Sequence, residues 1–101
     1  MADRILIVED EVHLAQGIRF NLELEGYQVE MIADGSEALE RLASPHVEKR
    51  LFDLVLLDVM LPGTDGFAVV REMRKAGNFT PVLMLTAKGL PSDVVNGMEA
   101  G

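Results

Sequence analysis

Carboxylate and hydroxyl side chains follow three short apolar runs of the sequence, at the point where each run ends. These residues are Glu9 and Asp10 after the first run, Asp58 after the second, and Thr86 after the third. If the runs are parallel strands, their carboxyl ends lie at one edge of a sheet, where ligands bind. Neighbouring strands are about 4.8 Å apart, so Glu9, Asp10 and Asp58 come within reach of one ion if the first two of these runs are adjacent strands.

Three carboxylates this close repel one another unless a cation lies among them. A site made only of oxygen ligands, with open positions, suits Mg²⁺, which keeps some of its waters and shares its ligands with phosphate groups. The pattern therefore predicts a magnesium site made by Glu9, Asp10 and Asp58, with the hydroxyl of Thr86 at the same edge.

The elements that position these residues follow from the hydrophobic pattern. The apolar runs at 5–8, 54–57 and 82–85 do not alternate with polar residues. Such runs are typical of strands buried on both faces, as in parallel sheets covered by helices. A weaker run at 28–32 alternates, and this favours an edge strand.

The segments between the runs have helical spacing. In the first, four apolar residues are expected to face inward: Val12, Ala15, Ile18 and Leu22. Gly26 is expected to end this helix. The second helix is expected from about 34–36 to before Pro45, the third from Asp65 or Gly66 to near Gly77, and a fourth from near Pro91. The order βαβαβαβα predicts an α/β fold, a doubly wound parallel sheet with helices on both faces.

Composition narrows the function. The chain has 101 residues, of which 49% are hydrophobic and 26% are charged, as expected for one globular domain. Nine basic and seventeen acidic residues give a net charge of −8, which argues against direct binding of nucleic acid or anionic membranes. There is no cysteine, and therefore no thiolate site. No signal peptide or membrane span is recognisable, so we expect a cytoplasmic protein.

Glycine motifs for nucleotide phosphates are missing after the first apolar run. Neither Gly-x-Gly-x-x-Gly nor Gly-x-x-x-x-Gly-Lys occurs there, and acidic residues occupy the place instead. This argues against dinucleotide-binding and P-loop proteins.

Four segments together resemble the receiver domain of bacterial two-component response regulators. They are ILIVEDE at 5–11, DLVLLD at 53–58, MLPGTDG at 60–66 and PVLMLTA at 81–87. The resemblance covers essentially the whole chain and is greatest to receivers that precede winged-helix DNA-binding domains. It implies one receiver domain over residues 1–101 with a flavodoxin-like fold and strand order 2-1-3-4.

The resemblance also implies a mechanism. Asp58 would be the nucleophile that accepts a phosphoryl group from the phosphohistidine of a sensor histidine kinase. Glu9, Asp10, Asp58 and the backbone carbonyl of Met60 would hold Mg²⁺, the implied cofactor. Thr86 would donate a hydrogen bond to a phosphoryl oxygen, and the small side chain of Ala87 would leave its backbone N–H facing that oxygen.

The chain departs from the family pattern at its C-terminal end. The family's fifth strand, the lysine that follows it and the fifth helix are absent, and Lys88 occupies a different position that does not replace that lysine. We therefore expect a fragment of a longer protein, incomplete at its C-terminus. The run at 82–85 then becomes an apolar edge strand, which predicts self-association or marginal stability.

Other functions stay open at this point. An Asp-nucleophile phosphohydrolase usually has a second Asp two residues after the nucleophile, but Met60 stands there. The chain is therefore not expected to be an enzyme beyond its own phosphorylation and dephosphorylation. A receiver-like interaction module that works without phosphorylation, or a non-functional truncated fragment, is the main alternative, because the lysine is missing.

Overall fold

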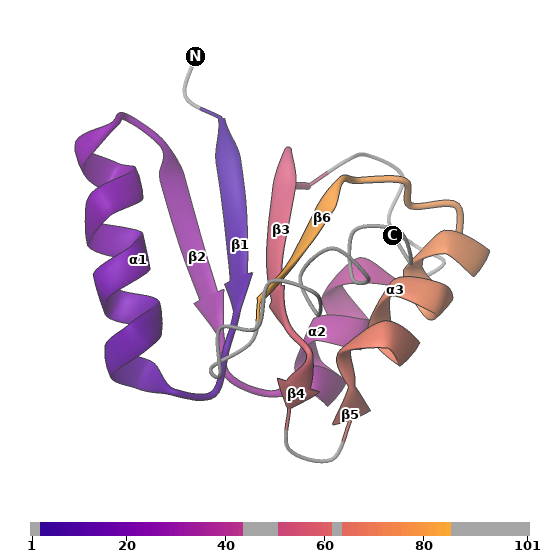
Figure 1. The fold of residues 1–101 in the computed structure, drawn as a ribbon. Coiled ribbons are helices and arrows are strands. Elements are labelled where there is room, and N and C mark those ends of the chain that lie inside the picture. The colour runs from indigo at the N-terminus through magenta and orange to yellow at the C-terminus, as the bar shows by residue number, and fades with distance from the viewer. Residues whose placement is uncertain (1–2, 44–50, 62–63, 86–101) are drawn as a thin grey trace.

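The computed structural model describes residues 3–43, 51–61 and 64–85. Its main sheet has four parallel strands in the order β2-β1-β3-β6, which confirms the predicted α/β class and the 2-1-3-4 strand order (Figure 1). The strands are β1 (Arg4–Val8), β2 (Gln28–Ile32), β3 (Leu54–Asp58) and β6 (Val82–Leu85). The helices are α1 (Val12–Leu24), α2 (Gly35–Leu42) and α3 (Gly66–Lys75).

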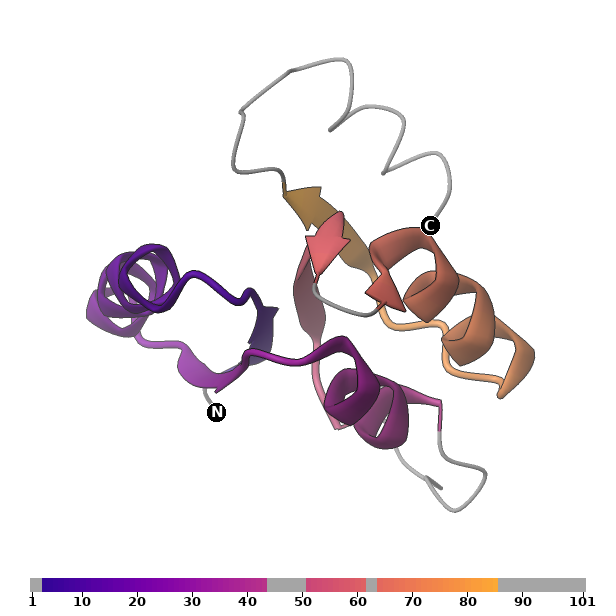
Figure 2. The ribbon, with the colours of Figure 1, turned by 90° about the horizontal axis from the view of Figure 1, so that it is seen from below.

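Helices cover both faces of the sheet, as the apolar runs predicted. The helix α1 lies on one face, and α2 and α3 lie on the other (Figure 2). Along β1, Ile5 and Ile7 pack on the α1 side, whereas Leu6 and Val8 pack on the α2 and α3 side. Every side chain of this strand after Arg4 is therefore buried, and this explains why its sequence does not alternate.

Two helices end at the glycines that the sequence indicated. Gly26 (φ 95°) follows α1 and Gly77 (φ 86°) follows α3, and only glycine adopts this left-handed backbone at low cost. After α1, the N–H of Gly26 donates to the carbonyl of Glu23 and the N–H of Tyr27 donates to that of Leu22. These bonds satisfy carbonyls that the end of the helix leaves free.

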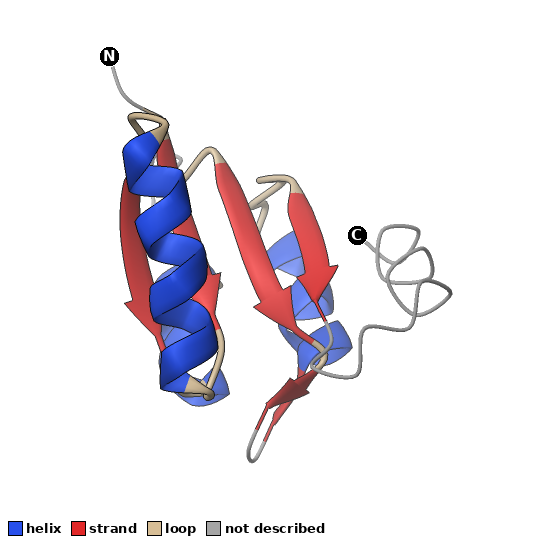
Figure 3. Cartoon of the chain, turned by 60° about the vertical axis from the view of Figure 1, so that its left-hand side comes forward, coloured by secondary structure: helices blue, strands red, loops and turns tan. Residues whose placement is uncertain are grey.

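The structure corrects one prediction and adds one element. Val12 was expected to face inward, but as the first residue of α1 it is 51% exposed, whereas Ala15, one turn further along, is buried. A two-stranded antiparallel hairpin that was not predicted follows β3, made of β4 (Met60–Leu61) and β5 (Thr64–Asp65) (Figure 3). The expected fourth helix lies outside the described residues.

The connection from α3 to β6 is fixed by polar groups. The Nδ2 of Asn78 donates to the carbonyl of Leu42 at the end of α2 (3.0 Å), and its Oδ1 accepts from the hydroxyl of Thr80 (2.6 Å). Arg74 donates to the carbonyls of Asn78 (3.0 Å) and Thr80 (2.8 Å). These bonds join α2, α3 and the start of β6.

No helix in the described part of the chain is long and apolar enough to cross a bilayer.

Candidate functional site

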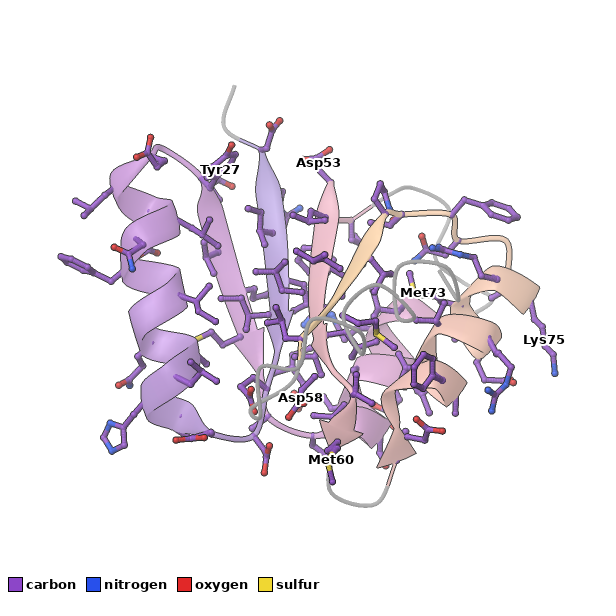
Figure 4. All side chains as sticks on the ribbon, viewed as in Figure 1. Tyr27, Asp53, Asp58, Met60, Met73 and Lys75 are labelled. Atoms are coloured by element: carbon purple, nitrogen blue, oxygen red, sulfur yellow. The ribbon has the colours of Figure 1, made fainter. Side chains whose placement is uncertain are left out.

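The parallel pairing of β1 and β3 brings the predicted acidic residues together. Val8 pairs with Leu57, so Glu9, the next residue after β1, lies beside Asp58, the last residue of β3. One carboxylate oxygen from each of Glu9, Asp10 and Asp58 lies within 4.8 Å of the other two. Figure 4 shows Asp58 at the carboxyl end of the sheet, opposite the end that carries Asp53. The strand adjacency that the site required is thus confirmed.

Glu9 is held in a buried position, with only 3% of its surface exposed. Its backbone N–H donates to the carbonyl of Ile32 (3.0 Å), and its Oε2 accepts from the N–H of Glu11 (3.0 Å). Its second oxygen, Oε1, is buried without a hydrogen-bond partner among the described residues. A buried carboxylate oxygen without a partner is costly, so this atom is suited to a cation.

The same surroundings raise the pKa of Glu9 to about 7. Burial is the main cause, because it disfavours the charged carboxylate, and the N–H of Glu11 partly opposes this effect. The carboxylate of Asp58 close by raises the pKa further, because its negative charge also disfavours a charged Glu9. Glu9 therefore takes up a proton near neutral pH when no cation offsets the charge of its neighbours.

Asp58 is also buried, with 2% of its surface exposed. Its Oδ1 accepts the N–H of Met60 (3.1 Å), and the N–H of Val59 donates to the carbonyl of Leu85 (2.9 Å). Asp10, in contrast, is exposed. The cluster therefore has two buried carboxylates and one at the surface, and this leaves it open to solvent on the side of Asp10.

The structure brings together Glu9, Asp10 and Asp58, and it places Met60 directly beside them. Met60 is 65% exposed, and its hydrogen bond to the cluster is made by its backbone N–H, which donates to Oδ1 of Asp58. Thr86 and Ala87, the other predicted site residues, lie outside the described part of the chain, as does Lys88.

Two features of the site were not found from the sequence. One is the N–H of Glu11, which holds Glu9, and no sequence pattern reports a backbone donor of this kind. The other is the β4–β5 hairpin, which directs the chain away from Asp58 and back to α3. The Pro-Gly pair at 62–63 indicated a turn beside the site, but the two-residue strands that flank it gave no sequence signal.

Comparison with known proteins assigns a family to this arrangement. Residues 5–101 match the family described as the response regulator receiver domain. The chain is 43% identical over 98 residues to the transcriptional regulatory protein DltR of Streptococcus agalactiae, with 97% of this chain and 42% of DltR covered. It is 42% identical over 101 residues to the response regulator MprA of Mycolicibacterium vanbaalenii, with 100% of this chain and 42% of MprA covered. The chain thus spans about two fifths of these relatives.

Solved structures give the same family. The receiver domain of the sensor histidine kinase PA1611 from Pseudomonas aeruginosa, which has a magnesium ion coordinated in its active site cleft, superimposes with a TM-score of 0.80 at 34% identity. That match covers 100% of this chain and 80% of the PA1611 domain. The non-phosphorylated receiver domain of HemR from Leptospira biflexa has a TM-score of 0.75 at 37% identity, with 98% of this chain and 76% of that domain covered.

Proposed function

This chain belongs to the response regulator receiver domain family, and we propose that Asp58 is the residue at which it accepts a phosphoryl group in two-component signalling. The single observation that carries this assignment is the position of Asp58, at the carboxyl end of a central strand and within 4.8 Å of two further carboxylates. The other aspartate of this cluster, Asp10, is exposed and follows β1, whereas Asp58 is buried and ends β3.

The transfer requires one bond to form and one to break. A carboxylate oxygen of Asp58 attacks the phosphorus of a phosphohistidine, and the P–N bond breaks. The electron pair stays on the imidazole nitrogen, which then takes up a proton from water. The product on this chain is an acyl phosphate. The hydrogen bond from the N–H of Met60 to Oδ1 fixes the orientation of the attacking carboxylate.

Glu9, Asp10, Asp58 and the backbone carbonyl of Met60 are the proposed holders of Mg²⁺. Support comes from the unpartnered Oε1 of Glu9 and from the three oxygens that lie within 4.8 Å of one another. Bound there, Mg²⁺ would supply the positive charge that offsets the negative charge of the transferred phosphoryl group. We propose that the hydroxyl of Thr86 and the backbone N–H of Ala87 contact the phosphoryl oxygens.

A sensor histidine kinase is the proposed phosphoryl donor, and control of transcription is the proposed outcome of the signal. This second proposal rests on relatives such as DltR, which is named a transcriptional regulatory protein. The cytoplasmic location expected from the sequence stays a prediction.

The test uses a small acyl phosphate donor, acetyl phosphate, with Mg²⁺ and the wild-type chain. Intact-mass spectrometry is expected to show the addition of one phosphoryl group to wild type and none to Asp58→Asn. The matched control is Asp53→Asn, which changes an exposed aspartate just before the opposite end of the same strand. Equal phosphorylation of wild type and Asp58→Asn would show that another residue is the acceptor.

We also propose that a second copy of this chain pairs with the outer edge of β6. In the described sheet β2 and β6 are the two edge strands, and β6 pairs with β3 on one side. Its side chains, Val82 to Leu85, carry no charge that would repel another copy. Unprotected apolar edge strands tend to pair in this way.

A further inference from the structure

Two glycines are each the first residue of a helix, and each lies in close contact with Asp58 or with the β4–β5 hairpin. Gly66 is the first residue of α3, and a Cβ placed on it would lie 2.6 Å from the carbonyl oxygen of Asp58 and 3.0 Å from the Cα of Val59. Real Cβ atoms essentially never come within 3.0 Å of another atom of this kind. Because both neighbours are backbone atoms, neither can turn aside as the end of a long side chain can.

The need at Gly66 is one of space, since the described glycines with positive φ are Gly26 and Gly77. The N–H of Gly66 donates to the carbonyl of Val59 (3.0 Å), and the side chain of Asp65 caps the helix by accepting from the N–H of Phe67 (3.0 Å). The first turn of α3 is thereby fastened to the peptide that directly follows Asp58.

Gly35 has a similar place at the start of α2. A Cβ on Gly35 would lie 2.6 Å from the Cβ of Thr64, which belongs to the β4–β5 hairpin. In that hairpin Thr64 pairs with Leu61, and Asp65 pairs with Met60. Pressure on Thr64 is therefore passed across the hairpin to Leu61, the neighbour of Met60, whose backbone is proposed to serve the site.

We propose that Gly66 and Gly35 are positioning residues for the metal and phosphoryl site, because their missing side chains let α3 and α2 close on Asp58 and on the hairpin that carries Met60. This inference rests on the proposed function, since it concerns the geometry of that same site. Alanine at either position displaces the backbone of Asp58 or of the hairpin and so changes its position relative to Glu9 and Asp10. Misplacement of site atoms by about 1 Å is enough to cost on the order of a hundredfold in activity.

The experiment measures the Mg²⁺ dissociation constant by calorimetry, first for wild type and then for variants. Gly66→Ala is expected to weaken Mg²⁺ binding by about tenfold or more. Gly17→Ala is the matched control, because Gly17 lies within α1 and a Cβ there meets nothing within 4 Å. It is expected to leave Mg²⁺ binding unchanged.

A spectroscopic readout separates positioning from general stability. In ¹H–¹⁵N spectra recorded well below the melting temperature, Gly66→Ala is expected to shift the amide signals of Asp58, Val59 and Met60, whereas Gly17→Ala leaves them in place. If Gly66→Ala does not fold, Gly35→Ala decides the question. It is expected to weaken Mg²⁺ binding, and the double variant Gly35→Ala with Thr64→Gly is expected to restore it by removing the clashing Cβ.

The outcomes separate the two proposals. Wild type that binds no Mg²⁺ contradicts the proposed function, and the positioning role with it. Wild type that binds Mg²⁺, with a folded Gly66→Ala variant of equal affinity and unshifted signals, overturns the positioning role alone. A Gly35→Ala variant that binds Mg²⁺ with wild-type affinity also overturns the positioning role. The same holds if Gly35→Ala loses Mg²⁺ affinity and adding Thr64→Gly does not restore that affinity.

Discussion

Glu9 combines burial, an unpartnered oxygen and a raised pKa. Its pKa of about 7, against an ordinary value of 4.5, means that the folded chain favours the protonated form. Without a cation, its contribution to stability is thus present below about pH 4.5 and is lost as the pH rises through about 7. A cation reverses this preference, because it needs the ionised carboxylate.

Mg²⁺ binding is therefore expected to depend on pH. Between pH 6 and pH 8 the dissociation constant should fall by about tenfold, because Glu9 gives up one proton on binding and that proton is already lost at the higher pH. Calorimetric titrations at the two pH values measure this change. The variant Glu9→Gln, whose side chain cannot ionise, should bind Mg²⁺ weakly and with the same affinity at both pH values. A wild-type dissociation constant that does not change with pH would contradict the role given to Glu9.

At the scale of single residues, the sequence predicted which carboxylates lie close together but not which of them are buried. Glu9, Asp10 and Asp58 each follow or end a strand, and parallel pairing is enough to bring such positions together. That Glu9 and Asp58 are buried and Asp10 is exposed depends on the path of the chain after each strand. The N–H donors of Glu11 and Met60 arise from the same local backbone path, which residue types do not specify.

At the scale of elements, the connection between α3 and β6 has a testable structural role. Asn78 joins the end of α2 to this connection through three hydrogen bonds, with the carbonyl of Leu42 and with the hydroxyl and N–H of Thr80. The next residue, Phe79, is 73% exposed and contributes little to the core. The loop thus contains a structural residue and a dispensable one side by side.

Asn78→Ala is expected to lower the free energy of unfolding by about 2 kcal/mol, because it leaves the hydroxyl of Thr80 and the carbonyl of Leu42 without these partners. Urea denaturation measures the change. Phe79→Ala is the control and should change the free energy of unfolding by less than about 0.5 kcal/mol, since surface substitutions usually have small effects. Equal stability of Asn78→Ala and wild type would show that water replaces these bonds without cost.

Elements with strong local signals were predicted well, and those made by tertiary contact were not. The non-alternating runs at β1, β3 and β6 and the glycines that end α1 and α3 fixed most of the fold. Val12 was misplaced because helical spacing shows which residues share a face but not that the first residue of this face is exposed at the end of the helix. The two-residue strands of the hairpin are too short to produce a periodic pattern.

At the scale of the whole molecule, the outer edge of β6 is the surface that we propose for pairing with a second copy. Figure 3 shows β6 at one side of the described sheet, far from α1. Its Leu83 and Leu85 are partly buried and pack with the apolar cluster on the α1 side. An uncharged edge beside such a cluster favours pairing between copies.

Leu83→Lys is expected to shift the chain toward monomer, since a charged residue on an edge strand opposes pairing. Sedimentation velocity at several concentrations measures the fraction of dimer. Phe79→Lys makes the same change at an exposed apolar residue outside the strand, and it should leave the association unchanged. A wild-type chain that is monomeric at every concentration, or equal effects of the two substitutions, would contradict pairing through β6.

The central claim is that Glu9, Asp10 and Asp58 form a metal-binding phosphoacceptor site, and a ¹H–¹⁵N spectrum of the chain titrated with Mg²⁺ tests it most directly. We predict saturable movement of the amide signals of Glu9, Asp10, Asp58 and Met60, with the signals near Asp53, at the opposite end of the sheet, unchanged. Signals at the cluster that do not respond to Mg²⁺, or that respond no more than those near Asp53, would contradict the account.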